Sequence, residues 1–429
     1  MTNSINFNEL ERFKCELDKC TGCGYCTFWC PIYQEDPRES SVARGKIKMQ
    51  KQLLAGEVEY DAEFEDRLNR CMLCGTCTEH CQSATETQSL IIAARADKVK
   101  AKGLPFPYSF VYRQLIPRRV LFGNLVRFAS WFQGIFLPKT EGTIRHLSLF
   151  LSALGEGRHI PSVAPKFLRQ LVPVVNKPAQ GVKTKMRVGY FSGCMTDFIF
   201  PNVGTSIIDF LTKNGVEVVL PKEQGCCGTP VYQGAGDFAT GRKLADANVK
   251  AFADLDVDYI ITNCATCISA LTDYNKYLAD TPERHEAYQK FAAKLKDITA
   301  FLTDVLQLPA SAYQVAPEVK GKNVTWHDPC HLNRYMKIRE QPRKILRSIP
   351  GIKFVEMKRS DWCCGMAGTF SIKYYETSKK IANKKIETIK ESGADIVATN
   401  CPGCMIQIID NSIRNKLPVK VMHIMELIR

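Results

Sequence analysis

Two sets of repeated cysteines constrain this chain more than any other feature of its sequence. The first set is the run Cys20-x2-Cys23-x2-Cys26-x3-Cys30, which recurs 51 positions later as Cys71-x2-Cys74-x2-Cys77-x3-Cys81. The second set recurs 136 or 137 positions later and consists of Cys194, Cys226, Cys227, Cys264 and Cys267, then Cys330, Cys363, Cys364, Cys401 and Cys404. Two copies of a five-cysteine spacing indicate a duplicated structural unit.

The number of cysteines also limits which roles the thiols of this chain can have. It holds 19 cysteines in 429 residues, and its first ten residues show neither the basic nor the apolar region of a secretory signal. Thiols in a reducing cytoplasm stay free, catalytic or metal-bound. No stretch reaches the roughly 18 consecutive apolar residues of a membrane-spanning helix. The sequence therefore predicts a cytoplasmic protein, at most peripheral on the inner face of the cell membrane.

The spacing within the first set is typical of iron–sulfur chemistry. A [4Fe–4S] cubane needs four thiolates, and the x2-x2 spacing lets three cysteines wrap one cluster while the fourth serves the other cluster. The predicted ligands of the first cluster are Cys20, Cys23, Cys26 and Cys81. The predicted ligands of the second cluster are Cys71, Cys74, Cys77 and Cys30. Structural zinc is the alternative, but zinc sites use separated cysteine pairs, whereas four cysteines crowd each run here.

The second set of cysteines lies in a repeated α/β pattern. Copy one is predicted to contain the strands Val188–Phe191, Val216–Leu220 and Tyr259–Thr262 and the helices Val203–Lys213 and Phe238–Phe252. Copy two is predicted to contain the strands Val324–Trp326, Lys353–Glu356 and Ile396–Ala398 and the helices Arg343–Ser348 and Tyr374–Glu391. Strands that alternate with helices favour parallel sheets. We expect all ten cysteines at the carboxyl ends of strands or in the turns beside them.

Four segments follow from these patterns. They are a helical two-cluster ferredoxin domain (1–100), a connector (101–185), copy one (186–310) and copy two (311–429). The predicted fold class is α+β for the whole chain and α/β for each duplicated unit. The connector is interrupted by eight prolines, and residues 101–180 hold 11 Lys and Arg against only Glu141 and Glu156. Most of the net charge of +14 therefore lies in this partly helical segment.

The paired cysteines of the second set point to a metal centre. Adjacent cysteines cannot easily form a disulfide, whereas two neighbouring thiolates could hold two irons of one cluster. The pattern Cys194…Cys226-Cys227-Gly228…Cys264-x2-Cys267 resembles the cysteine-rich CCG domain of heterodisulfide reductase and glycolate oxidase iron–sulfur subunits. That resemblance implies five cysteines per copy binding a non-cubane [4Fe–4S] cluster, in one copy or in both. Zinc, or thiols that serve only as core residues, are the alternatives.

The order of the domains resembles three related families. They are the iron–sulfur subunit of bacterial glycolate/D-lactate oxidase, the iron–sulfur subunit of anaerobic glycerol-3-phosphate dehydrogenase and the D-type heterodisulfide reductase subunit. Local sequence favours the first family through the segments Pro221–Pro230, Thr262–Cys267 and His327–Leu332. The segment Cys363–Phe370 is similar to both oxidoreductase subunits and less like the glycine-richer heterodisulfide reductase form.

The function implied by this resemblance is electron transfer without a catalytic residue on this chain. No flavin or nicotinamide fingerprint is recognised, so the organic chemistry is predicted to occur on another polypeptide. The resemblance implies an iron–sulfur subunit of a flavin-dependent glycolate or D-lactate dehydrogenase complex. Its partners would be an FAD-containing dehydrogenase subunit and a quinone, cytochrome or electron-transferring flavoprotein. A heterodisulfide reductase-like catalytic cluster and a glycerol-3-phosphate dehydrogenase role are the alternatives, and no nucleic-acid-binding module is recognised.

A few residues outside these patterns could also carry function. Cys15 belongs to neither repeat and is predicted to be a small core residue. His327 and His331 flank Cys330 and could ligate iron or move a proton, although a structural role is favoured. Gly234-Ala-Gly236 lacks the third glycine of a nucleotide-binding loop and is not interpreted as one.

The connector has a basic and aromatic stretch with two interpretations. Its members are Arg113, Arg118, Arg119, Arg127, Phe128, Trp131 and Phe132. It could rest on an anionic membrane surface beside a quinone pool. It could instead pack against partner subunits, which is the favoured interpretation.

Overall fold

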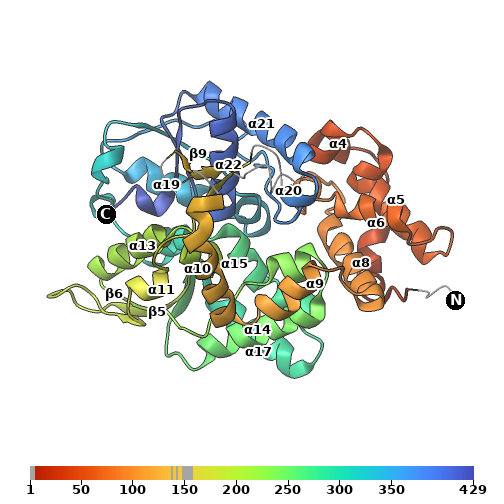
Figure 1. Cartoon of the computed structure of the whole chain (residues 1–429), viewed down its shortest axis with the longest axis horizontal. Coiled ribbons are helices and arrows are strands. Elements are labelled where there is room, and N and C mark those ends of the chain that lie inside the picture. Colours follow the sequence, from red (N-terminus) through yellow and green to blue (C-terminus); the bar gives the residue numbers. More distant parts are fainter. Residues whose placement is uncertain (1–4, 137–138, 142–143, 147–157) are drawn as a thin grey trace.

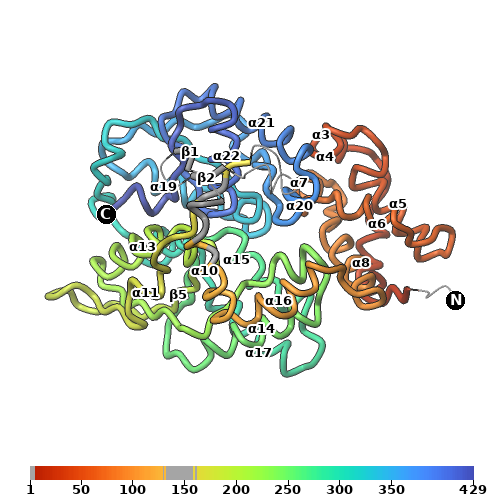
Figure 2. The backbone as a smooth tube through the Cα atoms, viewed as in Figure 1, coloured from red at the N-terminus to blue at the C-terminus, as the bar shows by residue number. Residues whose placement is uncertain are grey.

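The computed structural model describes residues 5–136, 139–141, 144–146 and 158–429. A helical N-terminal domain forms one end of the molecule, and two sheet-containing units lie beside each other at the other end (Figure 1). The connector crosses from the helical end over the surface of the first unit (Figure 2). The side chain of Phe132 lies outside the described part of the structure.

The N-terminal domain is helical, as predicted. They are α1 Asn8–Glu11, α2 Lys14–Asp18, α3 Cys26–Trp29, α4 Pro31–Glu35, η1 Glu39–Ser41, α5 Ala43–Leu54, α6 Ala62–Asn69, α7 Thr76–Glu79 and α8 Thr87–Lys102. Asp61 caps α6 by accepting a hydrogen bond of 2.8 Å from the Phe64 N–H, which satisfies a donor that the helix leaves unpaired. The buried Leu90 and Ile91 of α8 pack at the centre of this domain.

The connector is partly helical, as predicted. Its helical segments are α9 Tyr108–Phe110, η2 Val111–Leu115, α10 Arg119–Phe136 and α11 Leu168–Leu171. An antiparallel sheet that the sequence did not predict contains β1 Lys139–Glu141, β2 Ile144–His146 and β3 His159–Pro161. A further strand, β4 (Val175–Asn176), pairs with a strand of copy one. No helix in the described part of the chain is both long and apolar enough to cross a membrane.

Copy one is built on a five-stranded sheet of order β4-β6-β5-β7-β8, in which only β4 is antiparallel to its neighbour. Its strands are β5 Met186–Phe191, β6 Val216–Val219, β7 Tyr259–Thr262 and β8 Leu295–Asp297. Its helical segments are α12 Gly193–Phe198, α13 Pro201–Lys213, η4 Thr229–Gly234, α14 Phe238–Ala253, α15 Ala265–Thr272, α16 Tyr274–Leu278, α17 Pro282–Lys294, α18 Ile298–Ala300 and η5 Phe301–Val305. The predicted strands and helices of this copy are confirmed to within two residues at each end.

Copy two repeats the plan with a four-stranded parallel sheet of order β10-β9-β11-β12. Its strands are β9 Asn323–Trp326, β10 Lys353–Phe354, β11 Ile396–Thr399 and β12 Lys420–His423. Its helical segments are η6 Ala310–Ala312, η7 Pro317–Val319, η8 His331–Tyr335, α19 Glu340–Ser348, α20 Phe370–Lys373, α21 Tyr375–Ser392, α22 Pro402–Arg414 and η9 Ile424–Glu426. The α/β prediction is therefore confirmed for both copies.

The two copies share one hydrophobic core. The buried Val188 and Ile261 of copy one belong to the same cluster as Val324 and Val397 of copy two. Between the copies, the Ala265 N–H donates a hydrogen bond of 2.9 Å to the Asn400 carbonyl, and the His423 Nε2 lies 2.9 Å from the Asn263 carbonyl. The first bond joins the segments after β7 and β11, in which Cys264 and Cys401 lie, and the second joins the end of β12 to the segment after β7.

The ferredoxin domain packs on copy one through a partly polar interface. The hydroxyls of Ser89 and Tyr277 lie 2.9 Å apart, and Lys276 pairs with Glu86. Gly236 lies against α8, where a Cβ would approach the Arg95 carbonyl carbon to 2.4 Å. The Gly234-Ala-Gly236 segment thus has a packing role at this interface.

Asp273 gives this interface a predicted dependence on pH. Burial raises the pKa of Asp273 to about 7, whereas an unfolded aspartate titrates near its usual value of about 3.9. The folded protein therefore binds an extra proton between these values, and the free energy of unfolding falls as the pH rises through them. We expect Asp273→Asn to unfold at a higher temperature than wild type at pH 8, and at the same temperature at pH 4. Anaerobic calorimetry of the iron-loaded proteins measures this, and equal melting temperatures at pH 8 would refute it.

Candidate metal centres

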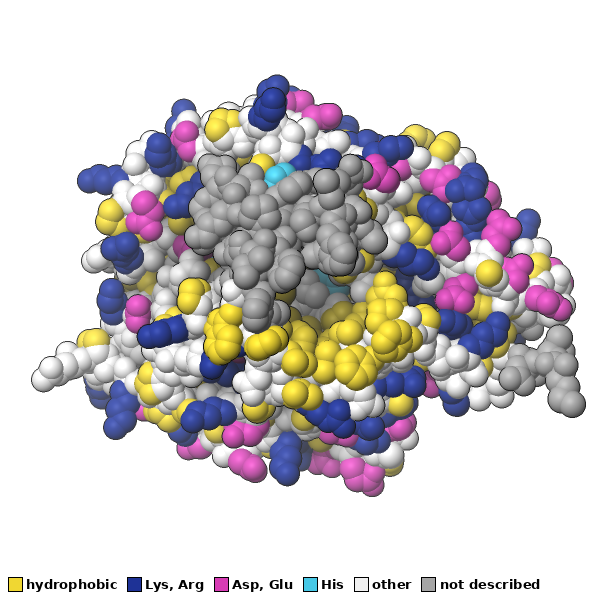
Figure 3. Space-filling view, viewed as in Figure 1, with side chains coloured by type: hydrophobic (Ala, Val, Ile, Leu, Met, Phe, Trp, Pro, Cys, Tyr) yellow, Lys and Arg dark blue, Asp and Glu magenta, His cyan; other side chains and the backbone are white. Residues whose placement is uncertain are grey.

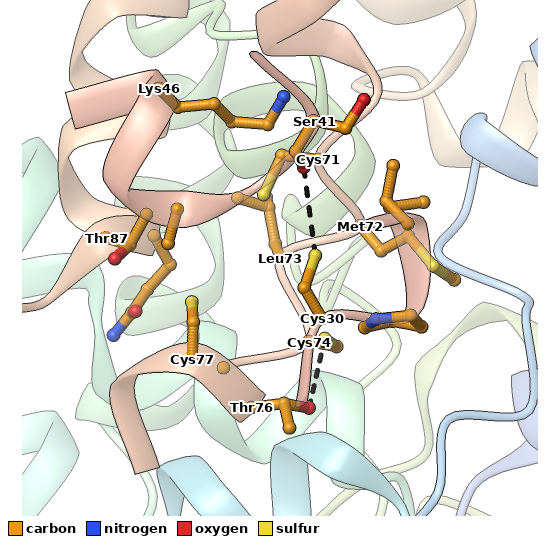
Figure 4. A pocket seen from close by; sticks show the side chains of 15 residues that line it. Cys30, Ser41, Lys46, Cys71, Met72, Leu73, Cys74, Thr76, Cys77 and Thr87 are labelled. Carbon is orange, nitrogen blue, oxygen red and sulfur yellow. Dashed lines mark hydrogen bonds between the residues drawn. The ribbon is translucent and has the colours of Figure 1, made fainter. Parts of the chain in front are cut away.

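Four cysteines of the ferredoxin domain line one pocket. Figure 4 shows the thiols of Cys30, Cys71, Cys74 and Cys77 around a common space. Cys30 comes from the end of the first cysteine run, and the other three come from the second run. The sequence-based set Cys71, Cys74, Cys77 and Cys30 is therefore brought together in the fold.

The surroundings of these thiols fit a metal cluster. Burial raises the pKa of Cys30 to about 12, and burial followed by the charge of Cys71 holds the pKa of Cys77 well above its usual range. Free thiols in this pocket would stay protonated and crowded, whereas bound metal removes their protons. The Cys74 sulfur also lies 3.3 Å from the Thr76 hydroxyl, a hydrogen bond of the kind that tunes ligand sulfur.

Buried cations surround the same pocket. Lys46 lines it, and burial lowers the pKa of Lys46 to about 8. The Lys46 ammonium donates to the Ser40 carbonyl at 2.7 Å. Arg95 donates to the Cys71 carbonyl at 3.1 Å, and its side chain is buried. Such cations offset the negative charge of a thiolate-bound cluster.

The other ferredoxin cysteines, whose predicted cluster position we call the open ferredoxin site, are more exposed to solvent. Cys23 is exposed, and Cys20, Cys26 and Cys81 are half-buried. Burial raises the pKa of Cys26, and the neighbouring charge of Cys20 adds to the effect. The ring of Trp29 stacks on that of His80, beside Cys81, at 3.6 Å between centroids. Gly24 adopts a φ of +82°, a left-handed backbone conformation that favours glycine, and lies beside the Arg44 guanidinium.

The five cysteines of copy one form a continuous line of thiol contacts. Its order is Cys194, Cys226, Cys227, Cys267 and Cys264. Hydrogen bonds from Cys226 and Cys267 hold the pKa of Cys227 well below its usual range. This thiol is therefore set to act as a thiolate ligand.

Copy two forms a second line with the same order. Its members are Cys330, Cys363, Cys364, Cys404 and Cys401. The Cys364 and Cys404 sulfurs lie 3.3 Å apart. Hydrogen bonds from Cys264 of copy one and from Cys404 hold the pKa of Cys401 well below its usual range. The two lines therefore meet at Cys264 and Cys401, and the ten thiols form one array.

The strands explain where these thiols lie. Cys264 and Cys401 lie two residues beyond the ends of β7 and β11, and Cys194 and Cys330 lie a few residues beyond the ends of β5 and β9. The carboxyl ends of parallel strands share one edge of a sheet, so these positions converge as predicted.

The array also reaches the ferredoxin domain. The charge of Cys363 contributes to the raised pKa of Cys74, after burial, so the two thiols are neighbours. Cys74 packs in one apolar cluster with Ile32, Met72 and Phe370, and Cys330 and Cys363 lie against that cluster. The closely packed pocket of Cys30, Cys71, Cys74 and Cys77 is thus adjacent to the copy-two end of the array.

Arg334 joins these two sites, and the sequence-based prediction missed it. Its guanidinium donates to the Cys74 carbonyl at 3.4 Å and to the Asp361 carbonyl at 2.7 Å. Burial alone would lower the pKa of Arg334, but the negative charges of Cys74 and other neighbours outweigh it and raise the pKa. A comparison of the copies offers the only sequence signal, because Phe198 stands four residues after Cys194 where Arg334 stands four residues after Cys330.

The structure also shows where the three candidate residues outside the cysteine repeats lie. Cys15 is exposed, so its prediction as a core residue is wrong; α2 turns Glu16 and Leu17 inward instead. His331 has a structural partner, because its Nδ1 lies 2.5 Å from the Ser269 hydroxyl. His327 is buried beside Cys364 and Cys404, and burial lowers its pKa to about 3.

Family models match the cysteine-bearing parts of the chain. A 4Fe-4S dicluster domain matches residues 16–85, and a cysteine-rich domain matches residues 188–272 and 324–409. These matches support iron–sulfur clusters as the cofactors of the chain.

Known proteins resemble this chain over different shares of its length. The chain is 32% identical over 410 residues to a probable glycolate oxidase iron-sulfur subunit of Bacillus subtilis strain 168, covering 91% of this chain and 88% of that protein. It is 32% identical over 244 residues to lactate utilization protein A of Geobacillus thermodenitrificans strain NG80-2, covering 57% of this chain and 98% of that protein. A crystal structure of a hypothetical protein from Helicobacter pylori has a TM-score of 0.51 at 9% identity, covering 97% of this chain and 70% of that chain, and shows the fold alone.

The extent of the first match identifies the family. It covers 91% of this chain, and the chain itself matches a dicluster domain followed by two cysteine-rich domains, in the order that the sequence predicted. Relatives of this kind are iron–sulfur subunits of oxidoreductases. The chain belongs to the family of glycolate oxidase iron–sulfur subunits.

Proposed function

We propose that this chain is the electron-transfer subunit of a flavin-dependent glycolate or D-lactate dehydrogenase complex. Cys20, Cys23, Cys26 and Cys81 would hold one [4Fe–4S] cluster, and Cys30, Cys71, Cys74 and Cys77 a second. The five cysteines of each copy would hold a further cluster, in the non-cubane form that the resemblance implies. When bound, such clusters supply one-electron transfer.

One observation carries this proposal: the thiols form an ordered path through the protein. The exposed Cys23 of the first cysteine run marks one end, and Cys30 of the same run lines the buried pocket with Cys74. The path continues through copy two and crosses to copy one at Cys401 and Cys264. A catalytic site needs room for a substrate, whereas a path of buried and adjacent thiols suits electron transfer between two partners.

The connector covers the copy-one end of this path. Hydrogen bonding from Cys226 lowers the pKa of Cys194, and the charge of Arg119 at the start of α10 adds to the effect. Arg119 also pairs with the buried Asp197, and η2 packs on the turn after Cys227 through Tyr112 and Val231. The helices α9 and α10 are thus held over the last thiols of the array.

The outer side of these helices is apolar. Hydrophobic side chains gather over α9 and α10 (Figure 3). The exposed members are Phe106, Phe110, Val120, Leu121, Leu125, Phe128 and Trp131. We name this set the connector face. A concentrated apolar face marks an interaction site on a soluble surface. We propose that the connector face binds the FAD-containing dehydrogenase subunit, and that the acceptor, a quinone, cytochrome or electron-transferring flavoprotein, meets the open ferredoxin site.

Anaerobic co-purification tests this proposal. The tagged wild-type chain is expected to retain a dehydrogenase with bound FAD. Phe106 and Trp131 are 80% and 71% exposed, so replacing both with serine leaves the core intact. An aromatic anchor at an interface contributes about 2 kcal/mol and two anchors together about 4 kcal/mol, so we expect the double variant to bind the dehydrogenase roughly 700-fold more weakly. Its iron content should equal that of wild type.

The matched control is Val182→Ser, which changes an exposed apolar residue outside the connector face. It should retain the dehydrogenase. Retention of the dehydrogenase by the double variant, with loss of binding to vesicles of anionic lipid, would assign the connector face to a membrane instead. A b-type cytochrome without any flavoprotein would count against the whole proposal and favour heterodisulfide-type chemistry.

A further inference from the structure

His327 is a buried side chain whose ring nitrogens have no partner in the described structure. Only 1% of its surface is exposed, and neither Nδ1 nor Nε2 makes a hydrogen bond to a described residue. Leaving such a group unpaired costs about 1–3 kcal/mol. The buried imidazole therefore points to a partner that the described residues do not provide.

The position of the ring identifies what that partner is. A ring nitrogen of His327 and the sulfurs of Cys364 and Cys404 all lie within 4.8 Å of one another. Both cysteines belong to the array of copy two. Imidazole nitrogen and thiolate sulfur are both established ligands of iron, and imidazole replaces thiolate on one iron of some iron–sulfur centres.

Two other buried or half-buried histidines near the array behave differently. His331 Nδ1 has the Ser269 hydroxyl at 2.5 Å. His423 uses both nitrogens, with Nε2 2.9 Å from the Asn263 carbonyl and Nδ1 accepting the Met425 N–H at 3.2 Å. These histidines have structural partners, and His327 differs from them in having none among the described residues.

The duplication makes the position informative. His327 stands three residues before Cys330, and Phe191 stands three residues before Cys194 in copy one. Phe191 is fully buried, so a hydrocarbon ring fills that place without a ligand nitrogen. Each copy has the same five cysteines, whereas the aromatic ring at this position differs between the copies.

We propose that His327 supplies a ring nitrogen as a ligand to iron in copy two, so that the two cysteine-rich copies hold chemically different centres. Copy one then binds its centre through thiolates alone. Copy two binds its centre through thiolates and one neutral nitrogen. This inference rests on the proposed iron–sulfur function of the copies.

Mössbauer spectroscopy of protein loaded with 57Fe tests this proposal without relying on activity. The comparison is between wild type and His327→Phe, which copies the residue that copy one tolerates. We expect equal iron content and a change in the isomer shift of one iron subsite. His327→Gln, which keeps a polar side chain, provides a second variant if the phenylalanine protein folds poorly, and we expect the same change.

Isotope labelling identifies the nitrogen in the unaltered protein. Pulsed EPR of wild type labelled with 15N-histidine, poised in oxidised and reduced states, should show a histidine nitrogen strongly coupled to a centre. This coupling should disappear in His327→Phe and persist in the matched control His331→Asn. Superimposable Mössbauer spectra of wild type and both His327 variants would overturn the proposal. Stoichiometric zinc that is lost in those variants would overturn it as well, because it would assign the nitrogen to zinc.

Discussion

Replacing Cys74 with serine is expected to interrupt the path of thiols at the junction between the ferredoxin domain and copy two. Cys74 lines the pocket with Cys30, Cys71 and Cys77 and is the member of that set whose thiol neighbours Cys363. A cubane holds four irons, so we expect the variant to lose about four irons per chain. Copies one and two should keep theirs, because their ten thiols remain.

The expected functional result is a block of electron transfer between the cysteine-rich copies and the open ferredoxin site. In the complex with the dehydrogenase, substrate should still reduce the copies, while electrons no longer reach the open ferredoxin site. Iron analysis and anaerobic absorption spectroscopy measure both effects. Cys15→Ser is the matched control, because Cys15 is an exposed cysteine outside both repeats and should be replaceable without effect. Full iron content in Cys74→Ser would show that Cys74 is not a required ligand.

Replacing Arg334 with glutamine is expected to lower the reduction potentials of the centres on both sides of it. Its buried guanidinium contacts the Cys74 carbonyl and interacts with the charges of Cys330 and Cys363. A reduced centre carries one more negative charge than an oxidised one, so a nearby cation favours reduction. A unit charge several ångströms away at an effective dielectric constant of about 20 contributes on the order of 3 kcal/mol. This corresponds to a fall on the order of 100 mV for one electron.

The variant Arg334→Lys distinguishes the effect of the positive charge of Arg334 from the effect of its hydrogen bonds. Lysine keeps the positive charge and loses the paired contacts to Cys74 and Asp361. We expect it to restore most of the potential while remaining less stable than wild type. Potentiometric titration followed by EPR measures the shift, and a glutamine variant with unchanged potentials would show that Arg334 has only a structural role.

Much of the local structure could be predicted because its causes are local. The x2-x2 spacing follows from the need to place three thiolates around one cluster, so it is visible within one short segment. The strand β7 was predicted at its true bounds because Ile260 and Ile261 are buried and apolar, as the sequence pattern required. The ends of α14 and α21 were also close to their predicted positions.

The remaining features depend on contacts that no local pattern carries. The meeting of Cys264 with Cys401 arises from the packing of two loops that are far apart in sequence. Strand β8 contains only Leu295, Lys296 and Asp297 at the edge of its sheet, so it has almost no apolar signal. Cys15 was assigned to the core because it is small and apolar, yet the short helix α2 presents it to solvent. The lack of a partner for His327 among the described residues is likewise a property of the folded core alone.

The central claim is that this chain carries electrons away from a flavoprotein that oxidises a 2-hydroxyacid. The most direct measurement mixes the purified complex anaerobically with glycolate or with D-lactate and follows the visible absorbance of the iron–sulfur chain. We predict bleaching with one of these substrates, only when the FAD-containing subunit is present. Absence of bleaching in the intact complex with either substrate would contradict the claim. Re-oxidation of the reduced chain by a disulfide alone would also contradict it, because it would place catalysis on the cysteine-rich copies.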